Sequence, residues 1–504
     1  MLCDFQQGTC PPCPTSFNLA EHVLTAGAAT PDKIALAVLQ PFGAERWSFG
    51  RLRQAILGTG TGLLEYGLNP GDKLLMRLGN TVDFPIVFLG AIAAGIVPVP
   101  TSAQLSASDV RRMCDTLSPK AVVRGAGVPC PDELGRQIDV DTLGAWRRLP
   151  AAAFVRGDPN RLAYIVYTSG TSGQPRAVMH AHRAVWARKM MTEGWYALTP
   201  QDRVCHAGAF NWTFTLGSGL LDPWTRGATA LMLGADVTLD QIPLLLRRNE
   251  ASIFAAVPGV YRRLLGQDLS GLRTLRHGIS AGEKLPDSLR RAWRDQTGTE
   301  IYEAFGMSEC STFISGHPGR PARDGALGVA QDGRRIAIVG TDGPVMTGET
   351  GVIAVHRSDP GLTLGYLGAE ADTKACFQGD WFLTGDLGRM DPDGQVHYLG
   401  RSDDMMNAGG FRVSPLEVER ALAEFPGLNE IGVTEVEVKP HVRVIAAFYT
   451  CDDSVSQADL DAFVARSLPR YKQPRIMQKV AAIPRNPNGK LLRKALPPLW
   501  QGKN

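Results

Sequence analysis

The stretch Tyr167-Thr-Ser-Gly-Thr-Ser-Gly-Gln-Pro-Arg-Ala-Val-Met-His180 carries the strongest local signal in the chain. The apolar run 163–167 is typical of a buried strand, and the next six residues hold four hydroxyl side chains and two glycines. Glycines let successive backbone N–H groups converge, and Ser and Thr hydroxyls add donors, so this loop can hold phosphate oxygens. The Gly-x-x-x-x-Gly-Lys-Ser/Thr string of a P-loop occurs nowhere in the chain. The stretch therefore predicts a phosphate-binding loop of another kind.

Bulk properties limit the partners of the chain. Its 504 residues are 20% charged, with a formal net charge of +3, and this length favours roughly two to four folding units. Because the basic residues are spread along the chain, we expect neither nucleic acid nor an anionic membrane as a partner. Residues 84–108 carry no charge, but Pro85, Pro98 and Pro100 interrupt them. We therefore expect a buried helix and strand there, and no membrane span.

The cysteines favour a reducing compartment. Nine cysteines are ordinary for this length, and the N-terminus lacks a basic region leading into a long apolar one. We therefore expect a cytoplasmic protein without a secretory signal. Cys10-Pro-Pro-Cys13 has the spacing of a metal or redox pair, but no second pair follows at zinc spacing. We expect the proline-rich leader around it to be a mobile, inert terminus.

Strand-like and helix-like segments alternate over most of the chain, which predicts a layered α/β fold. One alternation runs from residue 16 to about residue 120, and a second begins at residue 163. Its strand-like segments are 163–167, 203–207, 228–233, 251–257, 274–279 and 300–305. Mostly parallel sheets covered by helices are built in this way, and they bind ligands at the carboxyl ends of their strands. The candidate motifs of this half follow such ends, so we expect them to share one crevice.

The character of the sequence changes twice after residue 316. Turns rich in Gly, Pro and Asp separate short strands in 317–400, which predicts a β-rich subdomain. From residue 401 a compact pattern of helices and strands resumes, and about one hundred residues suffice for a separate domain. We expect a large N-terminal domain, 1–400, and a small, mobile α+β lid domain, 401–504.

The hydroxyl-rich loop resembles the phosphate loop of the adenylate-forming superfamily, whose usual string is Thr-Ser-Gly-Thr-Thr-Gly-x-Pro-Lys-Gly. Residues 168–173 and Pro175 fit this string except at Ser172, and Arg176 and Ala177 replace its Lys-Gly. Ser keeps the hydroxyl of Thr, and Arg keeps the charge of Lys while spreading it over a fork. The resemblance implies that the phosphates of ATP are gripped by Thr168, Ser169, Gly170, Thr171, Ser172, Gly173 and Arg176.

The segment Tyr302-Glu-Ala-Phe-Gly-Met-Ser-Glu309 resembles the aromatic-Gly-x-Thr-Glu motif of the same superfamily. The match implies that Phe305 lies against adenine, that Ser308 helps to hold the α-phosphate, and that Glu309 binds Mg²⁺ through oxygen, which a hard cation prefers. Ser280-Ala-Gly-Glu-Lys284 is similar to the loop on the adenine side of these enzymes. The other nucleotide contacts implied by the two segments are Ala281, Gly282, Glu283, Glu303, Ala304, Gly306 and Met307.

The segment Trp381-Phe-Leu-Thr-Gly-Asp386 contains the Thr-Gly-Asp of the superfamily, in which the Asp accepts hydrogen bonds from both ribose hydroxyls. The resemblance implies that Tyr398 and Arg401 support the nucleotide beside it. Asp403 matches the hinge residue between the two domains of these enzymes. A short polar residue flanked by turn formers suits a large backbone rotation.

Two C-terminal segments are implied to serve two half-reactions. The segment 484–490, Pro-Arg-Asn-Pro-Asn-Gly-Lys, resembles the catalytic-lysine loop, with Lys490 bridging the carboxylate of the acid and the α-phosphate. A solvated basic tail is the alternative, which the turn directly before the lysine disfavours. Asn407-Ala-Gly-Gly-Phe-Arg412 is similar to the loop that admits the pantetheine arm of coenzyme A, with Gly409, Gly410 and Phe411 at the arm and Arg412 at the nucleotide phosphates. The implied catalytic residues are Lys490, Thr168 and Glu309.

The resemblance also implies residues of an acyl pocket. Phe210-Asn-Trp212 resembles segments that line the acyl tunnel in synthetases for medium-chain and aromatic acids, although Trp212 also suits a plain core position. Gly306 stands where acetate-using relatives carry a Trp that closes the pocket, so we expect room for a ring or several methylenes. We find no basic residue evidently committed to a second carboxylate. The candidate pocket residues are His206, Phe210, Trp212, Ala281, Gly306 and Met307.

Together the segments predict an AMP-forming acid–CoA ligase. It would adenylate an aryl, branched or medium-chain monocarboxylic acid with ATP and Mg²⁺, and then form a thioester with coenzyme A. The alternatives are an adenylation enzyme that loads a carrier protein and a non-catalytic nucleotide-binding regulator. No carrier-like Gly-Gly-x-Ser segment follows Lys490, which favours the ligase, and the presence of Lys490 and Glu309 disfavours a regulator. We expect a monomer or a homodimer.

Overall fold

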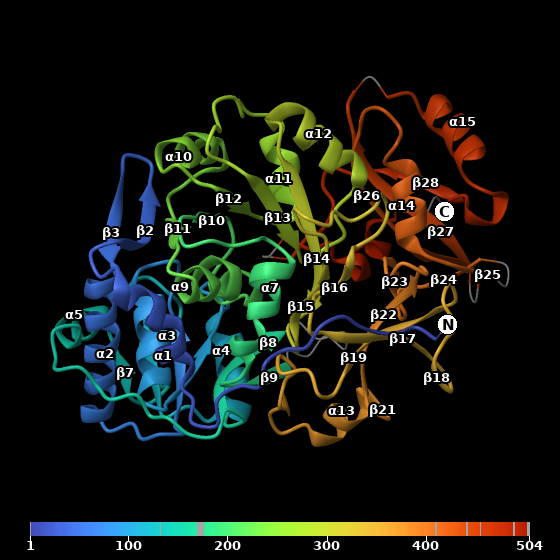
Figure 1. Cartoon of the computed structure of the whole chain (residues 1–504). Coiled ribbons are helices and arrows are strands. Elements are labelled where there is room, and N and C mark those ends of the chain that lie inside the picture. The colour runs from blue at the N-terminus through green and yellow to red at the C-terminus, as the bar shows by residue number, and fades with distance from the viewer. Residues whose placement is uncertain are drawn as a thin grey trace.

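The computed structural model describes residues 2–131, 133–168, 176–408, 411–439, 442–453, 455–486 and 489–500. For residues 407, 408, 411 and 412 it describes the backbone alone. Figure 1 shows the chain passing from the blue N-terminal elements at one side to a separate orange and red C-terminal lobe at the other.

A nine-stranded sheet forms the centre of the molecule. Its order is β16-β15-β14-β13-β12-β10-β11-β2-β3, and the strands from β14 to β2 are parallel. The strands are β2 (Ile34–Gln40), β3 (Gly43–Ser48), β10 (Arg203–His206), β11 (Thr229–Leu233), β12 (Ile253–Ala255), β13 (His277–Ala281), β14 (Glu300–Met307), β15 (Ser311–Ser315) and β16 (Val329–Ala330). The expected parallel strands from 203 to 305 are therefore confirmed, and their carboxyl ends share one edge.

A second, fully parallel sheet of order β5-β4-β6-β7 belongs to the first alternation. Its strands are β4 (Lys73–Arg77), β5 (Val97–Pro100), β6 (Ala121–Arg124) and β7 (Gln137–Ile138), and its helices are α2 (Phe49–Glu65), α3 (Asp83–Ala93), α4 (Ala107–Leu117) and α5 (Val140–Trp146). The Ser106 hydroxyl and the Asp109 carboxylate cap α4 reciprocally at its first turn. Helix α3 carries one charged residue, Asp83 at its start, and its other residues are buried. Over the described ranges, no helix combines the length and apolarity needed to cross a bilayer.

The first strand of the second alternation differs from our expectation. β8 (Leu162–Thr168) does not join the parallel sheet but pairs antiparallel with β9 (Arg176–Ala181), whose other neighbour is β20 (Gly365–Tyr366). Only seven residues separate the two strands, because Thr168 ends β8 and Arg176 begins β9. A parallel crossover needs about a dozen residues or more, so a hairpin is the geometry that this spacing allows.

Short helices surround the central sheets and lead the chain to the site. They are α1 (Leu19–Thr25), α6 (Ala184–Ala187), α7 (Lys189–Gly194), α8 (Thr213–Leu216), α9 (Asp222–Thr225), α10 (Ile242–Arg248), α11 (Pro258–Leu264), α12 (Asp287–Thr297) and α13 (Glu370–Ala375). Between α8 and α9 the residues Gly217–Leu221 form a π-helical turn, η2. This turn type is rare and occurs often at functional sites.

The β-rich region forms an antiparallel sheet that the N-terminus joins. Its order is β1-β17-β19-β22-β21, with β18 beside β17 and β23 beside β22. The strands are β1 (Asp4–Gln6), β17 (Arg335–Gly340), β18 (Gly343–Pro344), β19 (Thr350–His356), β21 (Phe377–Gln378), β22 (Trp381–Met390) and β23 (Val396–Arg401).

The expectation of a mobile leader is wrong, because β1 pairs with β17 and the Cys3 side chain is buried. The Trp186 indole also donates a hydrogen bond to the carbonyl of Pro11 at 2.7 Å. Cys10 and Cys13 are free thiols. The leader is thus part of the packed structure, and Figure 1 shows it running across the molecule to β17.

The C-terminal lobe has its own sheets and core. A two-stranded ribbon of β24 (Met406–Ala408) and β25 (Phe411–Val413) precedes a three-stranded sheet of β26 (Leu428–Lys439), β27 (Val442–Cys451) and β28 (Ile476–Lys479). Helices α14 (Pro415–Leu422) and α15 (Gln457–Ser467) supply Val418, Leu422 and Val464 to a core that also contains Ile445. This α+β composition agrees with the predicted C-terminal domain.

Candidate active site

The hairpin of β8 and β9 carries the residues predicted at the phosphates. Thr168 and Arg176 lie opposite each other in its register. The Arg176 guanidinium lies 3.0 Å from an oxygen of Asp372 and 4.9 Å from the centre of the Tyr366 ring. The remaining predicted phosphate contacts, Ser169, Gly170, Thr171, Ser172 and Gly173, lie outside the described residues and stay predictions. Arg176 therefore stands beside a tyrosine that sequence reasoning did not select.

Tyr366 connects this hairpin to the predicted metal ligand. Its hydroxyl donates to Oε1 of Glu309 at 2.8 Å. Burial and the neighbouring Glu309 carboxylate raise the pKa of Tyr366, which keeps the hydroxyl protonated. The N–H of Thr363 also fixes the carbonyl of Glu309, at 2.7 Å. Glu309 is thus held at the carboxyl end of β14 by two partners that face it from β20 and the loop before it.

The donor set suits a cation that is shared with phosphate. Within the described ranges, no three His, Cys, Asp or Glu side chains gather as a group that holds a metal by protein atoms alone. Mg²⁺ is commonly held by one or two carboxylates together with substrate phosphates and waters. Glu309 provides one such carboxylate oxygen, since Tyr366 occupies only one of its two oxygens. The residues present therefore fit Mg²⁺ bound with ATP.

The residues predicted on the adenine side lie on or directly after β13 and β14, and Tyr398 of β23 packs against them. The Phe305 ring lies 5.6 Å from the Tyr398 ring and 5.4 Å from the Phe313 ring, measured between centres. Glu303 is buried, and its two oxygens accept hydrogen bonds from the Lys284 ammonium and from the N–H of Leu285. The Glu303 side chain, which we predicted to contact the nucleotide, is therefore committed to bracing the 280–284 loop. Ala304 is buried within β14.

Asp386, the residue predicted to bind the ribose, is almost buried in β22. It is 9% exposed, accepts a hydrogen bond from the Tyr398 hydroxyl at 2.9 Å, and lies 3.4 Å from the Arg401 guanidinium. Burial raises the pKa of Asp386, and Arg401, Tyr398 and Lys490 oppose this shift. The opposition by Lys490 means that its ammonium lies within electrostatic range of Asp386, although about one hundred residues separate them. Tyr398 therefore contacts both Asp386, predicted at the ribose, and Phe305, predicted at the adenine.

An ion pair links the loop of Lys490 to the N-terminal domain. Arg485 lies 3.2 Å from Glu283 and 3.0 Å from Glu430, and it donates to the carbonyl of Gly489 at 2.6 Å. Burial raises the pKa of Glu283, and the cations Arg485, Arg262 and Lys490 lower it. Lys490 itself is exposed. The loop is therefore anchored at Arg485 while its lysine remains accessible at the crevice.

The turn before Lys490 has the conformation that its glycine permits. Gly489 has a φ of +84°, in the left-handed region that favours glycine. The N–H of Lys490 donates to the side-chain oxygen of Asn486 at 2.9 Å, and the N–H of Asn486 donates to the carbonyl of Lys490 at 2.9 Å. These bonds fix the backbone direction at Lys490, as the sequence predicted.

The predicted hinge and thiol loop are only partly described. Asp403 accepts from Nε of Arg401 at 3.0 Å, so the hinge residue is tied to the ribose side in this conformation. Gly409 and Gly410 lie outside the described residues. Phe411 and Arg412 belong to β25, which is described here by its backbone, with Arg412 opposite Asn407. The roles of these residues toward coenzyme A and phosphate stay predictions.

The predicted acyl residues fall into different packing environments. Trp212 packs beside Ala281 and Phe214, and a Cβ at Gly282 would lie 2.8 Å from its ring. Phe210 instead belongs to the large N-terminal core, 5.3 Å from the Phe84 ring. The structure therefore brings Trp212 and Ala281 together and separates Phe210 from them.

Three further members of the predicted acyl set have evident structural roles. His206 is buried against Phe214, with 4.4 Å between the two ring centres. Its Nδ1 accepts a hydrogen bond from the N–H of Gly208. A Cβ at Gly306 would lie 2.2 Å from the carbonyl of Ser311, because β14 and β15 shift register at a bulge there. Met307 packs against the core of the β-rich region. Close backbone approach is thus a second reason for the glycine at 306, besides the room that we predicted.

Three contacts around the site were missed by sequence reasoning. Tyr366 contacts Glu309 across 57 residues, and Arg485 contacts Glu283 across 202 residues. Arg188 and Asp222 form a buried ion pair near Ser311. Charged residues within the apolar segments 184–191 and 214–224 were the available signal, since a buried charge requires a partner.

Comparisons with known proteins show the family of the chain. The family model "AMP-binding enzyme" matches residues 23–367, and "AMP-binding enzyme C-terminal domain" matches residues 417–490. Benzoate–CoA ligase of Thauera aromatica is 30% identical over 498 residues, which cover 94% of this chain and 91% of the relative. 3-Hydroxybenzoate–CoA ligase of Aromatoleum sp. (strain CIB) is 27% identical over 486 residues, which cover 89% of this chain and 91% of the relative.

A solved structure shares the fold over almost the whole chain. The anthranilate CoA ligase AuaEII, in complex with anthranoyl-AMP, matches with a TM-score of 0.89 at 24% identity, covering 96% of this chain and 97% of that one. Both the N-terminal and the C-terminal parts of the chain thus have counterparts in these relatives. The chain belongs to the AMP-binding enzyme family, and it is an AMP-forming acid–CoA ligase that uses ATP, Mg²⁺ and coenzyme A.

Proposed function

We propose that this enzyme activates an aryl monocarboxylic acid, and that its body, residues 1–400, holds the nucleotide while its lid, residues 401–504, supplies a different group to each half-reaction. The observation that carries the proposal is a set of links between distant segments. Asp386 of β22 is joined through Tyr398 to Phe305 of β14, Glu309 lies in the turn after that strand, and Lys490 of the lid lies within electrostatic range of Asp386. In the proposed complex the nucleotide lies between these residues.

In the first half-reaction, the acid attacks the α-phosphorus of ATP, and pyrophosphate leaves. Asp386 accepts hydrogen bonds from the ribose hydroxyls, Phe305 supports the adenine, and Thr168 and Arg176 bind phosphate oxygens. Glu309 would hold Mg²⁺, which would supply positive charge to the phosphates of the leaving pyrophosphate. Lys490 places its ammonium between the attacking carboxylate and the α-phosphate, where it lowers the repulsion between two anions and stabilises the charge in the transition state.

In the second half-reaction, the thiol of coenzyme A attacks the acyl-adenylate, and AMP leaves. We propose that rotation about Asp403 removes Lys490 and brings the loop of Gly409, Gly410 and Phe411 to the crevice. The Arg485–Glu283 ion pair would break in this rotation, because its partners belong to the lid and the body. The conformation described here, in which that pair is intact at 3.2 Å, suits adenylation.

The proposal of an aryl acid is supported by the pocket and by the relatives. Trp212 and Phe214 place two aromatic rings 5.3 Å apart beside Ala281, at the carboxyl edge of the central sheet. Relatives named for benzoate, 3-hydroxybenzoate and anthranilate match the chain over about 90% of its length or more. Branched and medium-chain acids are the other members of the class that this pocket suits.

A panel of acids tests the proposed function. Purified enzyme is given ATP, Mg²⁺ and benzoate, hydroxybenzoates, aminobenzoates, hexanoate or acetate, and AMP release is measured with and without coenzyme A. We expect CoA-dependent AMP release that is highest with an aromatic acid and lowest with acetate. Acyl-hydroxamate formation without any response to coenzyme A would instead indicate an enzyme that loads a carrier protein. Acetate as the best acid would contradict the proposed pocket.

We also propose that the enzyme works in the cytoplasm. The support is its cysteine chemistry: all nine cysteines are free thiols, and five of them are buried. Thiols of this kind persist in a reducing compartment.

A further inference from the structure

The turn between β14 and β15 carries Ser308 and Glu309, the residues predicted at the α-phosphate and at Mg²⁺. Ser311, the first residue of β15, has a φ of +64°. This left-handed region is uncommon for residues other than glycine, and such a residue keeps it only where the surrounding structure holds it there. The turn therefore depends on contacts that fix Ser311.

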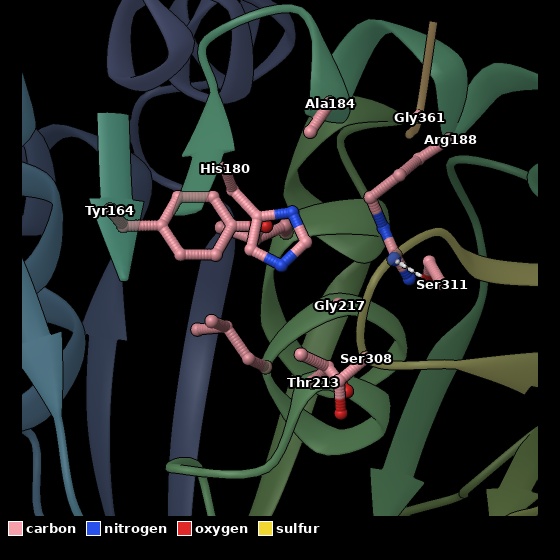
Figure 2. Close-up of a pocket in the computed structure, with 11 residues that line it drawn as sticks. Tyr164, His180, Ala184, Arg188, Thr213, Gly217, Ser308, Ser311 and Gly361 are labelled. Atoms are coloured by element: carbon pink, nitrogen blue, oxygen red, sulfur yellow. Dashed lines mark hydrogen bonds between the residues drawn. The ribbon is translucent and has the colours of Figure 1, made fainter. Parts of the chain in front are cut away.

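Arg188, which lies between α6 and α7, makes such a contact. Its Nη1 donates to the Ser311 hydroxyl at 2.6 Å, the bond drawn dashed in Figure 2. A hydrogen bond from a charged donor is stronger than one between neutral groups. Ser308 lines the same small cavity as Arg188 and Ser311, so this hydrogen bond lies directly beside the turn.

The guanidinium of Arg188 is itself fixed in place. Its Nε and Nη2 donate to the two carboxylate oxygens of Asp222 at 2.5 and 2.6 Å, and the Tyr196 hydroxyl donates to the same carboxylate. The Arg188 side chain is 9% exposed and that of Asp222 is 1% exposed. The π-helical turn η2 leads into Asp222, and a Cβ at its first residue, Gly217, would lie 2.0 Å from Nη2 of Arg188. The guanidinium therefore has one position, and in it the third nitrogen points at Ser311.

Stability alone does not account for this ion pair. The desolvation of two buried charges offsets much of their attraction, and apolar side chains of similar volume stabilise such a position at least as well. Apolar side chains cannot, however, supply a fixed hydrogen-bond donor to Ser311. The arrangement thus favours a positioning role for Arg188.

The turn is short enough to pass a change at Ser311 on to its neighbours. One residue, Cys310, separates Ser311 from Glu309, and the N–H of Cys310 donates to the carbonyl of Met307 at 3.2 Å. Tyr366 and Thr363 hold Glu309 from another side, as described above. A backbone rotation at Ser311 would therefore change the direction of the Ser308 and Glu309 side chains.

We infer that Arg188 is a positioning residue for adenylation. Held by Asp222, it keeps Ser311 in the left-handed conformation, and the turn then directs Ser308 to the α-phosphate and Glu309 to Mg²⁺. Arg188 acts through Ser311 and not by its own contact with the nucleotide. The inference rests on the proposed function, and it adds a residue that the phosphate and metal end of the site requires.

Nucleotide binding to a Ser311→Ala variant tests the inference. Loss of Arg188 alone would leave Asp222 buried without its partner and destabilise the fold, whereas Ser311→Ala removes the acceptor and keeps the ion pair. Calorimetric titration with Mg²⁺ present measures Kd for α,β-methylene-ATP, which resists cleavage between the α- and β-phosphates, and for adenosine, which has no phosphate. We expect Kd for α,β-methylene-ATP to rise by about tenfold, as is usual for the loss of one hydrogen bond to a charged group. Kd for adenosine should change by less than about twofold, because its predicted partners lie outside the turn.

A control and a second variant separate positioning from folding. Ser315→Ala removes a buried hydroxyl of the same strand, which donates to the carbonyl of Gly194 at 2.8 Å. It should change neither Kd by more than about twofold. Arg188→Met combined with Asp222→Leu replaces the ion pair by apolar side chains and should reproduce the rise for α,β-methylene-ATP. This double variant decides if Ser311→Ala does not fold, judged by its melting temperature.

The outcomes separate the inference from the proposed function. An unchanged Kd for α,β-methylene-ATP in Ser311→Ala would overturn the inference. An equal rise for adenosine, or the same rise in Ser315→Ala, would also overturn it, because either would indicate general loosening of the fold. A wild type that binds neither ligand would instead contradict the proposed function itself.

Discussion

The two sides of the reaction crevice are built in opposite ways. On the body side, Asp386 is 9% exposed and held by Tyr398 and Arg401, and Glu309 is held by Tyr366. On the lid side, Lys490 is exposed, and its loop reaches the body through the ion pair of Arg485 with Glu283. In the proposed mechanism the groups that hold the nucleotide and its metal are thus fixed in a packed scaffold, whereas Lys490, which serves one half-reaction, is carried on the lid. This difference lets one crevice serve two chemistries.

The body should be far more sensitive to acid than the lid. Eight of the nine histidines precede residue 401. Burial lowers the pKa of five of them to about 3 or 4: His22, His180, His182, His206 and His277. Because these folded-state values lie below the unfolded value of about 6.5, their contribution to stability is complete above pH 6.5 and is lost as the pH falls below it. By pH 5 the lost contribution of each histidine lowers the free energy of unfolding by at most about 2 kcal/mol. A typical free energy of unfolding is about 5–15 kcal/mol.

Urea unfolding followed by tryptophan fluorescence measures this effect. Eight of the nine tryptophans also precede residue 401, so the signal reports mainly the body. We expect the urea midpoint to fall steeply between pH 7 and pH 5, and His206→Phe to reduce the slope by about one fifth, as one of five such groups. An unchanged midpoint over this range would show that the body does not depend on neutral buried histidines.

Replacement of the lid lysine should separate the half-reactions. In Lys490→Ala, acid-dependent pyrophosphate release should fall by about 10²- to 10³-fold, the usual effect of losing one group that stabilises transition-state charge. Thioester formation from a supplied acyl-adenylate should remain near the wild-type rate. Lys494→Ala, in the same C-terminal segment, serves as the control. Parallel loss of both activities would contradict the assignment of Lys490 to one half-reaction.

Replacement on the body side should affect both half-reactions together. Asp386→Asn keeps the shape and one acceptor but removes the charge that serves the ribose. We expect about a 10- to 100-fold loss in adenylation and in thioester formation alike, since hydrogen bonds to charged groups contribute about 1.5–3 kcal/mol. The two half-reaction rates, measured separately on the same preparation, check this. A loss confined to one half-reaction would contradict the proposal that Asp386 of the body serves both.

Removal of the ion pair between lid and body should have a smaller effect, confined to adenylation. Arg485→Ala removes the half-buried pair with Glu283, and we expect about a fivefold slower adenylation, because the pair contributes about 1 kcal/mol. Thioester formation should not slow, since the lid must release this pair to rotate. A double-mutant cycle with Glu283→Gln isolates the coupling. Additive effects would mean that the ion pair does not position the loop.

The sequence allowed much of this architecture to be predicted. Periodicity predicted the strands from 203 to 305. The phosphate, adenine, ribose and lysine segments were predicted from short strings that resemble those of the adenylate-forming superfamily. The hairpin of β8 and β9 was missed because its sequence resembles a buried parallel strand, and the leader was missed because β1 pairs with β17, more than 300 residues away.

The parts of the site that were missed depend on tertiary contacts. The bond between Tyr366 and Glu309 and the pair of Arg188 with Asp222 join segments whose sequences do not indicate each other. Phe210 was expected beside Trp212 because the two are close in sequence, but Trp212 directly precedes α8, and the two side chains pack in different cores. Such pairings follow from the packing of the whole chain and not from any local pattern.

Binding of AMP tests most directly whether the body alone holds the nucleotide. Calorimetric titration is carried out on the wild type, Lys490→Ala and Asp386→Asn. We predict that Kd changes by less than about threefold in Lys490→Ala, since its exposed ammonium adds little in solvent, and that Kd rises by about tenfold or more in Asp386→Asn. Equal weakening in the two variants, or a larger one in Lys490→Ala, would contradict the division of the crevice into a binding body and a catalytic lid.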